Sequence, residues 1–111
     1  MSIERKKYCV NGEWKESKTE KWLPVTDSST GEVIAEVPSC TQEEVLEAID
    51  AADRAFREWS QVSISKRTQL LFKWRNILVA HLDELTELCA KELGKTLDEA
   101  KGDILKAIEP T

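Results

Sequence analysis

The chain has 111 residues, the length of one domain that could bury roughly two thirds of its unfolded surface. Its formal net charge is −5 with both signs interspersed, which argues against the basic stripe of a nucleic-acid-binding protein. The apolar runs are short and the first residues are charged, so we expect neither a membrane span nor a secretory signal.

The first part of the chain, residues 8–37, has the pattern of β-strands. Asn11-Gly12 is a strong hairpin signal between two short strand patterns, because a type I′ turn needs positive φ at both central positions. Further strands are expected at 22–26 and 32–37, with a turn between them. Alternation in the last strand predicts one apolar face, formed by Val33, Ala35 and Val37.

From Thr41 onward the apolar spacing becomes helical. Thr41 and Glu44 have the spacing of a capping box at the start of a helix. The pattern predicts four helices, over 42–59, 65–81, 83–93 and 97–108. The first helix has a narrow apolar stripe, formed by Val45, Ile49, Ala52, Phe56 and Trp59. The fold class is therefore α+β, and we expect a single unit over 1–111 with strands in 1–40 and helices in 41–111.

Cap signals locate the ends of the later helices. Ser63 or Ser65 is expected to cap the second helix, and Asp83 to help cap the third. Thr96 followed by Glu99 predicts a second capping box. The fourth helix should turn an apolar face inward, formed by Leu97, Ala100, Ile104 and Ile108.

Gly94-Lys95-Thr96 also matches the end of a phosphate-binding loop. That loop needs a further glycine five positions earlier, where this chain has Cys89, and a preceding buried strand, where the pattern is helical. We therefore interpret Gly94 as the left-handed glycine that ends a helix, with Lys91 and Lys95 beside the negative helix end.

Residues with catalytic potential do not form a recognisable constellation. Cys9, Cys40 and Cys89 lack metal or redox spacing, so we expect reduced thiols in a cytoplasmic protein. His81 has no neighbouring ligand pattern and falls at a helix junction. Acidic pairs lie in first helical turns, and the four tryptophans are expected in the core. We assign no catalytic, cofactor-binding or metal-ligating residue to this chain.

Four sequence blocks in order resemble the amino-terminal region of the NAD(P)-dependent aldehyde dehydrogenase superfamily. They are Asn11–Trp14, Ser29–Pro38, Ala51–Trp59 and Glu92–Ala100. The stretches Trp59-Ser60 with Leu71-Phe72-Lys73, and Gly94–Leu97 with Ala100–Asp103, are similar to the methylmalonate-semialdehyde dehydrogenase, CoA-acylating branch.

The resemblance implies a partial aldehyde dehydrogenase-like fold, the amino-terminal part of a cofactor-binding domain without its Rossmann-type core. It implies a parent enzyme that uses NAD, and in this branch CoA, to oxidise a malonate-type semialdehyde to an acid or an acyl-CoA. No residue here matches the family's catalytic cysteine, its general-base glutamate or its NAD site. We therefore expect an inactive fragment that binds no cofactor itself.

The alternative is a non-catalytic module that associates with itself or with a partner. Apolar helix faces without their usual cover would then drive homo-oligomer formation. In a swapped assembly the corner at Gly94 could straighten and merge two helices.

Overall fold

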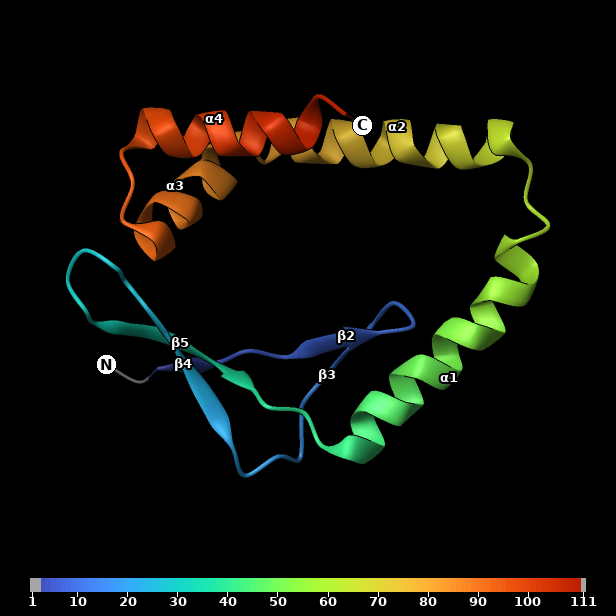
Figure 1. The fold of residues 1–111 in the computed structure, drawn as a ribbon, viewed down its shortest axis with the longest axis horizontal. Coiled ribbons are helices and arrows are strands. Elements are labelled where there is room, and N and C mark those ends of the chain that lie inside the picture. Colours follow the sequence, from blue (N-terminus) through green and yellow to red (C-terminus); the bar gives the residue numbers. More distant parts are fainter. Residues whose placement is uncertain (1–2, 111) are drawn as a thin grey trace. The chain divides into compact units, whose positions relative to one another are not determined.

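The structure is a computed structural model that describes residues 3–110, which form five strands and four helices (Figure 1). The strands are β1 Glu4–Arg5, β2 Tyr8–Val10, β3 Glu13–Lys15, β4 Trp22–Thr26 and β5 Val33–Pro38. The helices are α1 Gln42–Trp59, α2 Ile64–Ala80, α3 Leu82–Leu93 and α4 Leu97–Ile108. This confirms the predicted α+β class, and every helix end lies within one residue of its prediction.

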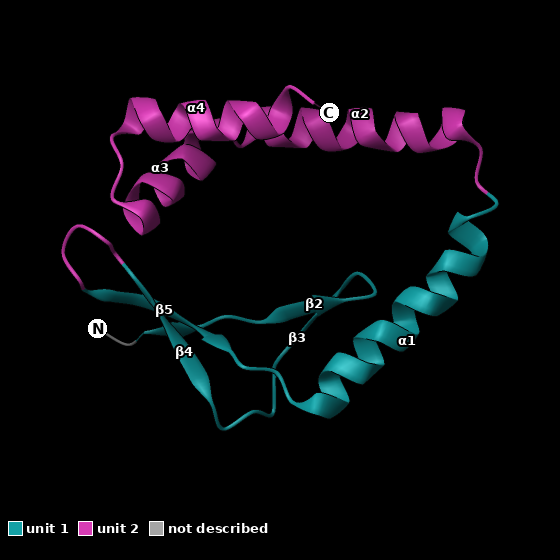
Figure 2. Cartoon of the chain, viewed as in Figure 1, with its two compact units in different colours: residues 1–26, 32–61 teal, residues 27–31, 62–111 magenta. Residues whose placement is uncertain are grey.

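The chain divides into two compact units (Figure 2). The first holds the strands and α1, up to Thr26 and again over Glu32–Gln61. The second holds α2, α3 and α4 together with the turn Asp27–Gly31. Whether the two act together as the single unit expected over 1–111 stays a prediction.

In the first unit, β2 and β3 form the predicted hairpin. Asn11 has a φ of 53° and Gly12 a φ of 75°, as a type I′ turn requires. The two strands pair antiparallel, with Tyr8 opposite Lys15 and Val10 opposite Glu13. The local turn signal therefore set both the hairpin and its register.

A second, three-stranded sheet has the order β1-β5-β4. β4 and β5 pair antiparallel, whereas β1 pairs parallel with β5, a strand that the sequence pattern did not reveal. The Arg5 guanidinium lies 4.7 Å from the ring centroid of Trp22. On the predicted apolar face of β5, Ala35 is buried but Val33 is exposed.

The helix starts follow their cap signals, with one exception. Thr41 and Glu44 form the complete capping box, and Ser63 caps α2 by accepting from the backbone N–H of Lys66. α3 begins after His81, not at an Asp83 cap, and no side chain caps it. The reason is the shortness of the junction. His81 still donates its backbone N–H to the last carbonyls of α2, which leaves no room for a separate cap residue.

The apolar core is small. Among residues 3–110, the buried apolar side chains are those of Ala35, Ala100 and Ile108. Three of the four tryptophans (Trp14, Trp59 and Trp74) are exposed, so the expectation that they form a core is wrong. Leu97 is likewise exposed, although it was expected to face inward. Helical period shows which side chains share a face, but it does not show that anything covers that face.

Candidate functional site

Glu44, in the first turn of α1, is a carboxylate whose oxygens bond both to a loop and to the helix cap. It is 9% exposed. Its oxygens accept hydrogen bonds from the Ser17 hydroxyl at 2.6 Å, the Lys18 backbone N–H at 3.0 Å and the Thr41 backbone N–H at 2.9 Å. Glu44 therefore completes the helix cap and also holds the loop between β3 and β4 against the start of α1.

These bonds fix the protonation state of Glu44. The Ser17 hydroxyl contributes most, followed by the backbone N–H groups of Lys18 and Thr41, and together they lower the pKa of Glu44 from 4.5 to about 2. The carboxyl group is ionised at neutral pH and its oxygens are already engaged. It is therefore suited to holding the loop, and not to donating a proton as a general acid.

A polar pocket of ≈ 650 Å³ opens beside Glu44 in the first unit. Lys15 lines the pocket and forms an ion pair with Glu47 at 2.9 Å, and this bond raises the pKa of the Lys15 ammonium. Tyr8 also lines the pocket, where burial and the nearby Glu44 charge raise the pKa of its phenol. The pocket therefore presents paired charges and a protonated phenol, and its lining contains no cysteine, serine or histidine to act as a nucleophile–base pair.

The corner Gly94-Lys95-Thr96 has the predicted helix-ending geometry. Gly94 has a φ of 68°. The backbone N–H groups of Gly94 and Lys95 both donate to the carbonyl of Ala90, at 2.9 and 3.2 Å. Thr96 accepts from the N–H of Glu99 as the cap of α4, without the reciprocal bond that completes the box at Thr41. These amides are used to end one helix and begin the next, whereas a phosphate loop would aim them at a ligand.

Lys95 is also engaged within the second unit. Its ammonium lies 2.5 Å from a carboxylate oxygen of Asp103. This hydrogen bond raises the pKa of Lys95 and lowers that of Asp103. A phosphate-binding lysine would have to be free to reach the ligand, so the corner does not fit the phosphates of a nucleotide or of NAD.

The turn Asp27–Gly31 packs against this corner, a contact that the sequence did not predict. The backbone N–H of Ser28 donates to the carbonyl of Lys91 at 3.1 Å, and its hydroxyl donates to the carbonyl of Glu92. A Cβ atom added at Gly94 would lie 3.2 Å from the Cβ of Ser28. Gly94 is therefore required both by its positive φ and by the close approach of the turn.

The remaining chemically active side chains stay apart from any built site. Cys9 is exposed, Cys40 and Cys89 are half-buried, and all three are free thiols. The acidic pairs lie in the first turns of α1, α3 and α4, as predicted. Among the described residues, no group of three or more acidic, histidine or cysteine side chains could hold a metal ion, and no helix is long and apolar enough to cross a membrane.

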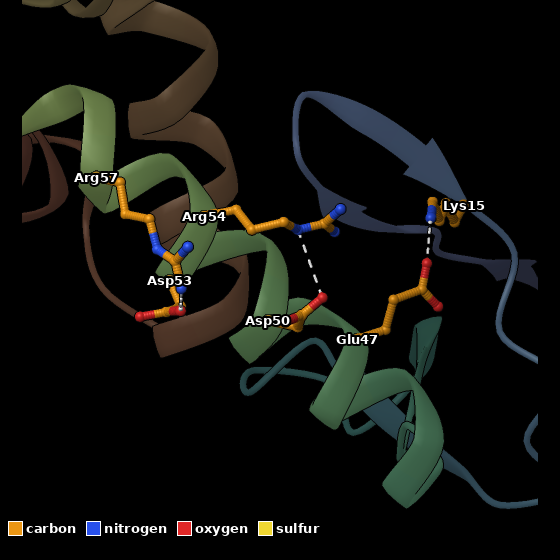
Figure 3. A network of polar contacts seen from close by, with 6 residues as sticks. All are labelled: Lys15, Glu47, Asp50, Asp53, Arg54 and Arg57. Carbon is orange, nitrogen blue, oxygen red and sulfur yellow. Dashed lines mark hydrogen bonds and ion pairs between the residues drawn. The ribbon is translucent and has the colours of Figure 1, made fainter.

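One side of α1 is a row of ion pairs (Figure 3). Arg54 lies 3.4 Å from Asp50, Arg57 lies 3.3 Å from Asp53, and the Lys15–Glu47 pair joins the helix to the hairpin. These pairs are exposed, and each contributes little to stability. They mark the solvated side of the helix and leave its apolar stripe on the other side.

Large apolar side chains on α1 and α2 are exposed. On α1, Ile49 is 60% and Phe56 63% exposed. A groove of ≈ 380 Å³ runs beside this stripe, between Tyr8 and Val10 of β2 and Val45, Ile49 and Ala52 of α1. On α2 no side chain is buried, and the exposed apolar residues include Leu70, Leu71, Phe72, Trp74 and Ile77. A helix that is apolar around much of its circumference normally lies inside a larger structure.

Comparison with known proteins gives one consistent match. The family model described as "Aldehyde dehydrogenase family" matches residues 14–111. Malonate-semialdehyde dehydrogenase 2 of Oceanobacillus iheyensis is 44% identical over 108 residues, which cover 97% of this chain and 22% of that protein. The malonate-semialdehyde dehydrogenase of Lacticaseibacillus casei is 42% identical over 109 residues, again covering 22% of its length. This chain thus spans about a fifth of the curated relatives that it matches.

Solved structures agree with the sequence match. Lactaldehyde dehydrogenase of Escherichia coli superimposes with a TM-score of 0.92 over 97% of this chain and 23% of that chain, at 24% identity, a likeness that shows the fold alone. A Sinorhizobium meliloti structure, described as a methylmalonate-semialdehyde dehydrogenase complexed with NAD, gives a TM-score of 0.91 at 25% identity, covering 97% of this chain and 22% of that chain.

Proposed function

The chain belongs to the aldehyde dehydrogenase family, and we propose that it supplies a non-catalytic, amino-terminal part of an NAD-dependent dehydrogenase of a malonate-type semialdehyde. The observation that carries the substrate class is the 44% identity, over 97% of the chain, to malonate-semialdehyde dehydrogenase 2 of Oceanobacillus iheyensis. The parent reaction would oxidise the aldehyde to an acid or, with CoA, to an acyl-CoA.

The chemistry of the described residues supports a structural role for this part. Glu44 is held ionised by three hydrogen bonds that its oxygens accept from the surrounding loop and helix cap. The corner amides and Lys95 have partners within the chain, so this corner does not fit the phosphates of NAD. In the proposed parent, NAD is held by residues outside this chain.

The exposed apolar faces support the same role. Phe56 on α1 and Trp74 on α2 are each more than half exposed. Burying one such side chain contributes on the order of 1.5–3 kcal/mol, so covering several would be strongly favourable. In the proposed parent the remainder of the dehydrogenase covers these faces.

An activity assay tests the proposal. The purified 111-residue chain is mixed with NAD and malonate semialdehyde, with and without CoA, and NADH formation is followed by absorbance. Full-length malonate-semialdehyde dehydrogenase 2 of Oceanobacillus iheyensis serves as the positive control. We expect no turnover by the chain and no heat of NAD binding in calorimetry. NADH formation that depends on the chain would overturn the non-catalytic role.

The second candidate function is a module that associates with itself. It is favoured by the small core and by the apolar groove beside β2. Light scattering of the purified chain distinguishes the two ideas, because a scaffold part without self-affinity stays at the mass of one chain at every concentration.

A further inference from the structure

The last turn of α3 has backbone carbonyl groups that no later residue of the helix can bond to. The N–H groups of Gly94 and Lys95 both donate to the carbonyl of Ala90. In a Schellman motif the left-handed residue would donate instead to the next carbonyl along the chain, which here is that of Lys91. The carbonyls of Lys91 and Glu92 are therefore left for donors from elsewhere in the chain.

Ser28 supplies both of these donors. Its backbone N–H donates to the carbonyl of Lys91 at 3.1 Å, and its hydroxyl donates to the carbonyl of Glu92. Ser28 lies 64 positions before Glu92, in a turn that belongs to the same compact unit as α3. The end of α3 is thus capped through a tertiary contact, by donors placed where the helix dipole gathers negative charge.

The turn that carries Ser28 is shaped by hydrogen bonds of its own. A carboxylate oxygen of Asp27 accepts from the N–H groups of Ser29 at 2.9 Å and Thr30 at 3.3 Å. The N–H of Gly31 donates to the carbonyl of Asp27 at 2.7 Å. This is an Asx-turn arrangement, and none of these bonds involves α3. Asp27 therefore holds Ser28 in place for the helix, which reduces the entropy lost when the turn docks.

The contact between the turn and α3 is small and lies at the surface. Ser28, Glu92 and Gly94 are all exposed. Segments held by a few exposed hydrogen bonds open locally at a lower free energy than the global unfolding of the chain. The turn can therefore separate from α3 while the middle of the helix stays folded.

We propose that the turn Asp27–Gly31 is a strap that closes the end of α3, and that the strap and the α3–α4 corner open in one cooperative step. When the strap is closed, Ser28 caps the helix. When it opens, the last carbonyls face water, and the bonds from Gly94 and Lys95 to α3 are lost in the same step. Asp27 is a positioning residue, because it acts through Ser28. The inference does not depend on the proposed function.

Amide hydrogen exchange of the ¹⁵N-labelled wild type tests the cooperative step. Exchange is followed residue by residue by NMR at several low urea concentrations, which measures the free energy of each local opening. The N–H groups of Ser28, Gly94 and Lys95 are expected to share one opening free energy and one small urea dependence. The N–H of Leu88, in the middle of α3, is expected to exchange through a costlier opening.

Ser28→Ala removes the hydroxyl bond and keeps every backbone group. Loss of one hydrogen bond of ordinary strength should speed exchange at Gly94 and Lys95 about fivefold, although the hydroxyl bonds to neither of these amides. Ser29→Ala is the matched control, because among the described residues the Ser29 hydroxyl makes no hydrogen bond to α3. This control should keep the exchange rates within about twofold of the wild type. Exchange at Lys6, which bonds to β5, should change in neither variant.

Two substitutions of Asp27 test its positioning role. Asp27→Ala removes the acceptor that shapes the turn and should speed exchange at Gly94 and Lys95 about as much as Ser28→Ala does. Asp27→Asn keeps an acceptor oxygen and should exchange like the wild type. A general loss of stability would instead speed exchange at Leu88 and Lys6 as well.

Three results would overturn the proposal. They are separate opening free energies for Ser28 and Gly94 in the wild type, wild-type rates at Gly94 and Lys95 in a folded Ser28→Ala, and equal acceleration at Leu88 in that variant. If Ser28→Ala does not fold, the wild-type opening free energies decide the question alone.

Discussion

Replacing Gly94 with alanine tests the interpretation of the α3–α4 corner. Gly94 adopts a φ of 68°, a left-handed conformation that costs an L-residue with a Cβ about 1–2 kcal/mol. Alanine also restricts the unfolded chain more than glycine does, which offsets about 0.4–1 kcal/mol of this cost in the free energy of unfolding. The added Cβ would in addition lie 3.2 Å from the Cβ of Ser28, so the turn Asp27–Gly31 must move or lose its bonds to α3. We expect a loss of about 2 kcal/mol in the free energy of unfolding.

Two other glycines in the second unit provide the controls. Gly31 has a φ of 77° with open space where a Cβ would lie, so Gly31→Ala reports the cost of the backbone conformation alone, about 1 kcal/mol. Gly102 lies inside α4, again with open space, and Gly102→Ala should stabilise the chain by about 1 kcal/mol. The difference between Gly94→Ala and Gly31→Ala isolates the contact with Ser28.

The measurement is urea unfolding followed by circular dichroism, with all variants at one low protein concentration. The expected order of stability is Gly102→Ala, wild type, Gly31→Ala and then Gly94→Ala. If Gly94→Ala were as stable as the wild type, the left-handed cap and its contact with Ser28 would not hold the corner.

Three further predictions follow from the polar contacts. The pKa of Glu44 is lowered to about 2, so its carboxylate stabilises the fold above the unfolded pKa of 4.5, and that contribution is lost as the pH falls toward 2. Thermal melts of Glu44→Gln over this pH range should lack this part of the pH dependence. Equal pH profiles for the variant and the wild type would contradict this role of Glu44. Thr96→Ala should lower the free energy of unfolding in urea by about 1 kcal/mol through loss of the α4 cap, and an unchanged midpoint would count against that cap. Lys95→Ala should leave the urea midpoint almost unchanged, because the ion pair of Lys95 with Asp103 is exposed. Calorimetry should detect no ATP binding to the wild type or to this variant. An ATP affinity of the wild type that disappears in the variant would support the phosphate-loop interpretation instead.

The features that the sequence predicted are those coded by a few neighbouring residues. The Asn11-Gly12 turn, the Thr41–Glu44 box and the Gly94 helix end each depend on residues within a few positions of one another. Their geometry is decided by backbone sterics and by short side chain–backbone bonds, so a single sequence is sufficient to find them. The family resemblance was found in the same way, from four local blocks that the comparisons then confirmed.

The features that the sequence did not reveal depend on residues far apart. Glu44 gains its second role from Ser17, 27 positions away, and Ser28 contacts Glu92, 64 positions away. The parallel pairing of β1 with β5 is also non-local. No periodicity predicts such contacts. The His81 junction was missed for a different reason: two helices share one residue there, and the usual cap spacing does not apply.

The central claim is that this chain serves as the scaffold of a malonate-type semialdehyde dehydrogenase, and a chimera tests it most directly. The 108 aligned residues of the Oceanobacillus iheyensis malonate-semialdehyde dehydrogenase 2 are replaced by the matching residues of this chain. The account predicts that the chimera folds and forms NADH from NAD and malonate semialdehyde. A chimera that folds, as judged by circular dichroism and its melting temperature, but forms no NADH would contradict it.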